Sequence, residues 1–328
     1  MYYRSIADMN ETILKNLHRL PQDIDVVVGI PRSGLLAANL LSLAVNIPLS
    51  DIDSYVQGRT YASGVTKTPM ATDEEARRKV LVLDDSINGG TAMTEARKKI
   101  AQSGIEADYI FAAVYGSKLS HPEADLVFEM LPQPRMFQWN FMHHKWLAQS
   151  CVDIDGVLCL DPTDAENDDG AAYLEFLGNA RKLYSTKRKI GTLVTSRLEK
   201  YRPSTEAWLA SNGIEYEKLV MLDLPSKAER QRLAVHGSFK AEHYRKSDAM
   251  LFIESENKQA IKIAQLSGKP VLCLETHQLI TPDIASVLAQ LPNVRSVSQS
   301  KDVAKRVART ILGTNRYAAL KKLISRSG

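Results

Sequence analysis

Cysteine is scarce in this 328-residue sequence, which contains three, Cys151, Cys159 and Cys273. Their number is odd and their spacing is unlike that of a metal site, so the sequence indicates neither a disulfide framework nor a cysteine-bound metal. Apolar runs as long as a membrane span are also lacking, as is an apolar signal segment at the N-terminus. From these absences we expect a protein of the reducing cytoplasm.

A large excess of one charge is lacking too, because 42 Lys and Arg stand against 38 Asp and Glu. Residues 301–328 hold eight basic groups and one acid, which leaves 34 basic and 37 acidic groups in the first 300 residues. A mildly acidic body offers no track for a phosphate backbone, so we expect no nucleic-acid partner.

The basic tail repeats apolar residues at helical spacing, as at Val303, Val307 and Ile311. Such a helix can lie on an anionic membrane surface, which would make the protein peripheral at the inner face of the membrane. The alternative is a terminal helix docked on the second domain, with its basic face in solvent. Both interpretations stay open.

Internal repeats and long low-complexity linkers are absent as well. Strand-length apolar runs alternate with amphipathic stretches, a pattern typical of α/β proteins with parallel sheets. Strands are predicted at 25–30, 79–83, 108–114, 125–129, 150–154, 190–194, 218–221, 249–253 and 271–274, and helices near 9–19, 34–45 and 91–103. The predicted fold class is α/β with two domains, 1–148 and 149–328, each a mostly parallel sheet flanked by helices.

Two adjacent acids follow an apolar strand in VLVLDDSINGGTAM, residues 80–93. The strand places Asp84 and Asp85 at the carboxyl edge of a parallel sheet, where open α/β folds bind ligands. The loop then enters a helix whose first N–H groups suit a phosphate monoester, and Gly89 and Gly90 allow a close backbone approach. The pattern predicts carboxylates that face the hydroxyls of a phosphorylated sugar.

This motif resembles the PRPP-binding signature of type I phosphoribosyltransferases. The resemblance implies that the acidic pair, counted as catalytic, contacts the ribose hydroxyls, and that Mg²⁺ takes part. GIPRSG, residues 29–34, resembles the family's pyrophosphate loop, and the polar stretch 55–75 resembles its mobile lid. The PRPP-binding residues implied are Arg32, Ser33, Gly34, Arg59, Lys67, Asp84, Asp85, Ser86, Asn88, Gly89, Gly90 and Thr91.

Two departures from the family pattern bear on the substrate. Many members carry a hydroxyl residue where Gly89 or Ala92 stands, which leaves the register of the 5-phosphate open by one residue. Several members that use nucleobases carry an acid at the position of Asn88, and an amide cannot act as a general base. Asn88 therefore argues against assigning this chain the nucleobase substrates of those members.

The second half opens with CVDIDGVLC, residues 151–159. Alternation points Asp153 and Asp155 to the same side of a strand end, and two carboxylates there form a natural Mg²⁺ site. The motif resembles motif I of the haloacid-dehalogenase superfamily. The resemblance implies that Asp153 attacks phosphorus to form an aspartyl-phosphate, and that Asp155 protonates the leaving alcohol and then activates water.

The other three motifs of that superfamily follow in order. The resemblance implies that Thr195 binds the transferring phosphoryl group. It also implies a charge-neutralising lysine, for which Lys240 and Lys246 are rivals and Lys240 is preferred. The catalytic set implied is Asp153, Asp155, Thr195 and Lys240, and the Mg²⁺ set is Asp153, Asp155 and Glu254. Phosphatase chemistry, the commonest in the superfamily, is the expected activity.

The stretch between motifs I and II, residues 160–189, is too short for a folded cap domain. A site without a cap can accept a phosphate at the end of a large molecule, so a macromolecular or lipid-linked substrate is predicted. In series, the two activities would add 5-phosphoribosyl to an acceptor and then remove its phosphate. The arrangement resembles the enzyme pairs that install β-ribofuranose in bacterial O antigens and capsules, which implies a glycan acceptor.

Acceptor contacts are predicted in PRMFQWNFMHH, residues 134–144. Phe137 and Trp139 could stack on a sugar, and His143 or His144 could accept a hydroxyl proton. The alternative is a packed interdomain core. Two other functions stay open: ribosylation of a nucleobase or small heterocycle followed by release of a nucleoside, and a non-catalytic PRPP-sensing regulator or scaffold. A homo-oligomer is also left open.

Overall fold

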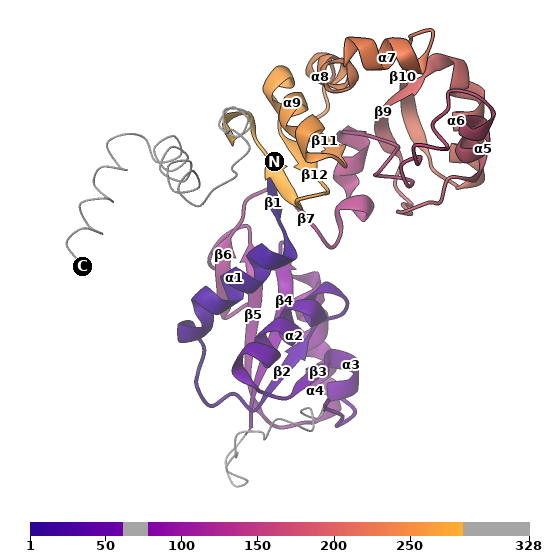
Figure 1. Cartoon of the computed structure of the whole chain (residues 1–328). Helices are drawn as coiled ribbons and strands as arrows, with labels where there is room; N and C mark the ends of the chain where they lie inside the picture. The colour runs from indigo at the N-terminus through magenta and orange to yellow at the C-terminus, as the bar shows by residue number, and fades with distance from the viewer. Residues whose placement is uncertain (62–77, 285–328) are drawn as a thin grey trace, which may run out of the picture. The chain divides into compact units, whose positions relative to one another are not determined.

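The computed structural model describes residues 1–61 and 78–284, and the chain divides into two compact units, Met1–Phe141 and Met142–Gly328 (Figure 1). Lys67, with most of the predicted lid, and the whole basic tail lie outside the described residues. None of the described helices combines the length and the apolarity that crossing a membrane requires.

The first unit is built on a five-stranded parallel sheet in the order β3-β2-β4-β5-β6. Its elements are β2 (Val26–Gly29), β3 (Leu49–Asp51), β4 (Lys79–Ile87), β5 (Asp108–Gly116), β6 (Leu126–Met130), α1 (Ile6–Asn16), α2 (Ser33–Val45), α3 (Ile52–Tyr55) and α4 (Thr91–Ser103). Alternation sends Val27 and Leu81 to the face that packs on α1 and α2. It sends Val28 and Val82 to the opposite face, against α3 and α4. Helices cover both faces, so ligands reach the sheet at strand ends.

A second, smaller sheet joins the two ends of this unit. β1 (Tyr2–Arg4) runs parallel to β7 (Arg135–Phe137), and the N–H of Tyr2 donates to the Pro134 carbonyl at 2.9 Å. Both strands are short, and each contains an arginine that interrupts the apolar pattern, which explains why neither was predicted from the sequence. The pairing holds the aromatic segment after β6 against the start of the chain.

The second unit contains a six-stranded sheet in the order β10-β9-β8-β11-β12-β13, parallel except for the last strand. Its elements are β8 (Ser150–Val152), β9 (Ile190–Leu198), β10 (Tyr216–Leu222), β11 (Leu251–Glu254), β12 (Val271–Cys273), β13 (Gln278–Ile280), α5 (Ala171–Asn179), α6 (Arg202–Ser211), α7 (Lys227–Leu233), α8 (His236–Lys246) and α9 (Asn257–Ser267). The boundary predicted between residues 148 and 149 falls in its 3₁₀ segment η3 (Lys145–Gln149), whereas the two units divide between Phe141 and Met142. The predicted class, α/β with two mostly parallel sheets flanked by helices, is confirmed.

Candidate active sites

The acidic pair of the first unit lies near the carboxyl end of β4, the central strand. β4 pairs with β2 only as far as Leu83, whereas it stays paired with β5 up to Ile87. Asp84 and Asp85 therefore stand where one edge of the strand becomes open, and they are 8% and 5% exposed. Gly34 allows this packing, because a Cβ there would lie 2.8 Å from Asp84 Oδ1. The end of the pyrophosphate loop expected at 29–34 thus lies against Asp84.

The two carboxyl groups differ in their partners. Asp84 Oδ1 accepts a hydrogen bond from the N–H of Asp85 at 2.9 Å, and Asp85 Oδ2 accepts one from the indole N–H of Trp139 at 2.8 Å. Burial, together with the charge of Asp85, raises the pKa of Asp84 to about 8. A bound cation, or hydroxyl groups that donate hydrogen bonds to the carboxylate, would lower this pKa and favour loss of the proton.

This pKa predicts a pH-dependent effect of Asp84→Asn on stability. Between the ordinary value of 3.8 and about 8, the unfolded chain has lost the proton that the fold retains, so wild-type stability falls as the pH rises through this window. Asparagine keeps the size and removes the charge. We expect the variant to unfold at a higher temperature than wild type, with a gain that grows up to about pH 8 and then levels off.

The measurement is thermal unfolding without ligand at several pH values. Asp53→Asn, which changes an exposed acid paired with Lys99 on α4, is the matched control and should stay within about 0.5 kcal/mol of wild type. A gain in unfolding temperature of the same size at every pH would contradict the raised pKa of Asp84.

The loop after β4 is exposed at its tip and is held by a hydrogen bond to Ser117. Asn88 and Gly89 are exposed, and Gly90, at φ +81°, precedes the first turn of α4, which begins at Thr91. The side chain of Asn88 accepts a hydrogen bond from Ser117 at 2.9 Å. The free N–H groups at the start of α4 suit a phosphate.

Four other predicted PRPP contacts in the described part of the chain lie at a helix start, near a strand end or on a loop. Arg32 is exposed and Ser33 is half-buried, both at the start of α2, and Ser86 is half-buried near the end of β4. Arg59 is exposed and bonds the side chain of Gln57 at 2.7 Å. Lys67 lies outside the described residues.

The aromatic segment meets the acidic pair through one residue. Trp139 is half-buried and reaches Asp85, as given above. Phe137 is 3% exposed and stacks between Tyr115, at 5.4 Å, and Trp139, at 4.6 Å between ring centroids. Phe137 therefore has no face left for an acceptor sugar, and packing explains it better than the predicted contact. His143 and His144 belong to the second unit.

Sequence reasoning missed Arg135, a buried arginine behind this site. It donates to the carbonyl of Ile87 at 2.9 Å and to that of Leu131 at 2.8 Å. These bonds fix the end of β4 to the segment that carries Trp139. An arginine beside a proline resembles a surface residue in sequence, so no local signal indicated its burial.

The acidic pair of the second unit follows β8, between β9 and β11. Asp153 is 4% exposed and accepts a hydrogen bond from Lys240 Nζ at 2.6 Å. Lys240 also donates to Glu254 at 2.8 Å, whereas Lys246 is exposed and pairs with Glu242. Of the two rival lysines, Lys240 is the one beside the predicted nucleophile.

The predicted Mg²⁺ ligands are only partly exposed to the pocket. Asp153 and Asp155 line it, but Glu254 is fully buried and bonds Lys240 and the N–H of Ser255. In the described part of the chain, no three acidic, His or Cys side chains form a ready-made metal cluster. Mg²⁺ commonly binds through one or two carboxylates and keeps several waters, so Asp153 and Asp155 still fit it. Burial raises the pKa of Asp153, which a cation would reverse.

Thr195 does not line the pocket. It is fully buried, and its hydroxyl accepts a hydrogen bond from the N–H of Arg197 at 3.2 Å. Its neighbour Ser196 lines the pocket instead. The Thr195 hydroxyl is thus not exposed to the pocket, and its phosphoryl contact stays a prediction.

A buried arginine, Arg197, holds Asp155 through two hydrogen bonds. Arg197 is fully buried, and its Nε and Nη2 donate to Asp155 at 3.1 and 2.6 Å. Its remaining donors reach Cys159 and Thr205. Arg197 fixes the orientation of Asp155. Sequence reasoning missed this pair, although the alternation of Thr195 and Arg197 along β9 would have indicated that both point to one side.

Arg197→Ala is expected to destabilise the second unit by about 3 kcal/mol. This is the lower end of the range for breaking a buried ion pair, because Asp155 keeps 20% of its side-chain surface exposed. Denaturant unfolding measures the effect. Arg232→Ala removes an exposed pair with Glu229 and should cost less than about 0.5 kcal/mol. Equal losses in the two variants would contradict the structural role.

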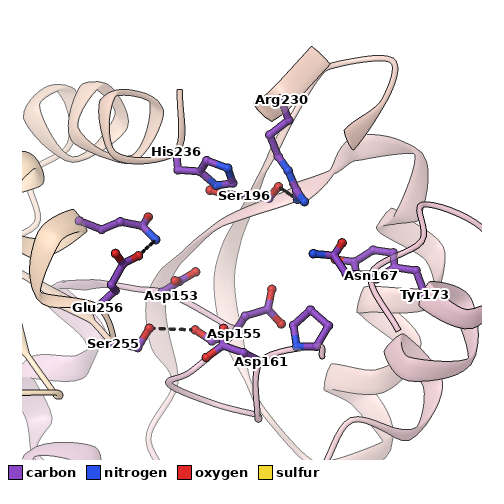
Figure 2. Close-up of a pocket in the computed structure, with 12 residues that line it drawn as sticks. Asp153, Asp155, Asp161, Asn167, Tyr173, Ser196, Arg230, His236, Ser255 and Glu256 are labelled. Atoms are coloured by element: carbon purple, nitrogen blue, oxygen red, sulfur yellow. Dashed lines mark hydrogen bonds between the residues drawn. The ribbon is translucent and has the colours of Figure 1, made fainter. Parts of the chain in front are cut away.

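These side chains surround a pocket of about 280 Å³ (Figure 2). It is lined by Asp153, Asp155, Asp161, Pro162, Asn167, Tyr173, Ser196, Arg230, His236, Ser255, Glu256 and Gln259. Residues 161–173, which are too few for a cap domain, nevertheless form one wall. The pocket is therefore bounded on more sides than the sequence predicted.

Comparisons with known proteins identify the first unit. Residues 2–132 match the family described as phosphoribosyl transferase domain. Over 126 residues the chain is 26% identical to the transcriptional regulator GfcR of Methanococcoides burtonii, which covers 38% of this chain and 57% of that protein. The chain thus matches little more than half the length of this relative. The N-terminal part of the chain contains a phosphoribosyltransferase domain.

Solved structures of phosphoribosyltransferases are also similar to this part. The xanthine-guanine-hypoxanthine phosphoribosyltransferase of Helicobacter pylori is 14% identical with a TM-score of 0.32, covering 42% of this chain and 92% of that one. The purine phosphoribosyltransferase of Pyrococcus horikoshii is 19% identical with a TM-score of 0.27, covering 42% and 86%.

Proposed function

We propose that this chain is a bifunctional enzyme that transfers 5-phosphoribosyl from PRPP to a glycan hydroxyl and then removes the 5-phosphate. The observation that supports it is the presence of two separate acidic pairs in one chain. Asp84–Asp85 and Asp153–Asp155 each lie at the carboxyl end of a central strand in their own sheet. This is where α/β enzymes bind ligands.

In the transfer step, the acceptor oxygen attacks C1 of ribose, the bond from C1 to pyrophosphate breaks, and the hydroxyl proton is lost to solvent. This inverts the α donor to a β product. Asp84 and Asp85 hold the ribose hydroxyls while the first turn of α4 holds the 5-phosphate. Mg²⁺, when bound, would stabilise the negative charge on the departing pyrophosphate. Trp139, fixed by its bond to Asp85, forms the wall beside the ribose. Its ring is the remaining aromatic candidate for an acceptor contact.

In the second step, Asp153 attacks the phosphorus of the 5-phosphate and the ribose alcohol leaves. Asp155, held by Arg197, enters this step protonated and gives its proton to that alcohol. It then takes a proton from the water that attacks the aspartyl-phosphate, which breaks the bond to Asp153 and releases inorganic phosphate. Lys240 balances the charge of Asp153 and Glu254. Mg²⁺, when bound by Asp153 and Asp155, would offset the charge of the phosphate.

Asn88 supports a glycan acceptor over a nucleobase. Several family members that use nucleobases carry an acid at this position, and an amide cannot replace that acid as a general base. A lipid-linked acceptor lies at the membrane surface, and the basic tail would bind the protein to that surface. The test is incubation of the full chain with PRPP, Mg²⁺ and a glycan acceptor, followed by mass spectrometry and measurement of released pyrophosphate. A product heavier by one ribosyl group supports the proposal, and the absence of pyrophosphate release would contradict it.

A second candidate is a regulator that binds PRPP without turning it over, favoured by the match to GfcR, which is named a transcriptional regulator. The two candidates differ in one measurement. A regulator would bind PRPP in a titration but release no pyrophosphate with any acceptor. The acidic body of the chain argues against direct DNA contact.

A further inference from the structure

The pocket of the second unit has an imbalance of charge. Its lining includes four carboxylate side chains, Asp153, Asp155, Asp161 and Glu256, and a single arginine. His236 also lines it, but burial lowers the pKa of His236 to about 4, so the ring is neutral near pH 7. A phosphate dianion that enters this pocket needs cationic donors beyond Mg²⁺.

The two buried cations nearest the aspartates are not available to a phosphate. The ammonium group of Lys240 has three N–H bonds, which go to Asp153 at 2.6 Å, Glu254 at 2.8 Å and Gln259 at 3.1 Å. The Nε and Nη2 groups of Arg197 are bonded to Asp155 and Cys159. Lys240 cannot bind a phosphate without giving up a buried hydrogen bond, which is costly, and Arg197 is fully buried and does not line the pocket.

Arg230 differs from both. It lies on α7, is 9% exposed, and donates from Nη1 to the carbonyl of Ser196 at 2.9 Å. Among the described residues, its buried Nε and the hydroxyl of Ser196 have no hydrogen-bond partner. Figure 2 shows Arg230 extending from α7 towards Ser196, on the side of the pocket that faces the aspartates. A buried N–H without a partner is unfavourable unless a ligand or an ordered water satisfies it.

The position of Arg230 is fixed by the loop before α5. Asp169 accepts hydrogen bonds from the N–H of Lys227 at 3.0 Å and from the hydroxyl of Tyr201 at 2.9 Å. The ammonium of Lys227 in turn bonds the carbonyl of Asn167. These contacts hold the start of α7 against the 161–173 wall, so Arg230 is oriented before any ligand arrives.

We propose that Arg230, which lines the pocket beside Ser196, binds a non-bridging phosphoryl oxygen of the substrate through its guanidinium group. The ligand class is a phosphomonoester dianion, and the inference rests on the proposed phosphatase function. Arg230 supplies the donor that Lys240 and Arg197 cannot supply. Phosphoryl binding would then involve a residue of α7, Arg230, in addition to the residues at the strand ends.

The test uses the full chain with Mg²⁺ and orthovanadate, a phosphoryl mimic, whose binding is followed by calorimetry. The part of the signal that Asp153→Asn removes reports this pocket and not the first unit. We expect Arg230→Ala to weaken that part roughly 10- to 100-fold, the scale of a lost charge-assisted hydrogen bond. Arg230→Lys should recover part of the loss. Arg232→Ala, on the same helix but exposed, should leave it unchanged.

The outcomes separate the two proposals. If Arg230→Ala binds vanadate as wild type does while Asp153→Asn does not, Arg230 has no such role and the phosphatase proposal stands. If vanadate binding depends on Arg230 but no phosphomonoester is hydrolysed, the phosphatase proposal fails and the anion site stands. If Arg230→Ala does not fold, Arg230→Gln, which can still donate to Ser196, decides instead.

Discussion

Asp153→Asn should make the protein accumulate a 5-phosphoribosylated acceptor, whereas wild type releases the product that is lighter by one phosphate. Asparagine has nearly the same shape and can still accept the hydrogen bond from Lys240, but it cannot attack phosphorus. Loss of a covalent nucleophile lowers turnover by roughly 10⁴-fold or more. Mass spectrometry of the acceptor after incubation with PRPP and Mg²⁺ measures both products.

Asp164→Asn is the matched control, because Asp164 is an exposed acid near the same motif that does not line the pocket. It should give the wild-type product. An unphosphorylated ribosyl product from Asp153→Asn would show that the two steps do not occur in series on this chain.

Changing Asp84 and Asp85 together to asparagine should abolish the transfer and leave the phosphatase intact. Each carboxylate that loses its charge forfeits a charge-assisted bond worth about 1.5–3 kcal/mol. Together the two changes should lower transfer about 100- to 10,000-fold. Release of pyrophosphate from PRPP measures the first activity, and hydrolysis of a small phosphomonoester measures the second.

The double variant also distinguishes a local effect from unfolding. The phosphatase assay shows whether the second unit remains folded, and Asp53→Asn serves as the control in the first unit. Transfer at the wild-type rate in the double variant would place the ribose elsewhere. Loss of both activities would indicate that the two units depend on each other for stability.

The main strands could be predicted because parallel strands buried on both faces are nearly continuous apolar runs. Their ends were harder to predict. β4 was expected to end at residue 83, but it continues through the acidic pair to Ile87, because Ser86 and Ile87 still pair with β5. α1 begins at Ile6 because Ser5 and Asp8 form a capping box, a signal that the apolar pattern alone does not contain.

The acidic pairs and Lys240 could be predicted because each stands at or near a recognisable motif. Their partners could not, because the chain brings them from far away. Trp139 lies 54 positions beyond Asp85, and Arg197 lies 42 beyond Asp155. Such contacts arise from tertiary packing, which overrides local patterns.

The short pairing of β1 with β7 determines where the transferase unit can be cut out of the chain. The family match ends at residue 132, yet a fragment ending there would leave Tyr2–Arg4 without its partner strand. It would also remove Trp139 from Asp85 and Arg135 from the end of β4. A fragment that runs through Phe141 keeps all three, so it should fold and bind PRPP where the shorter one does not.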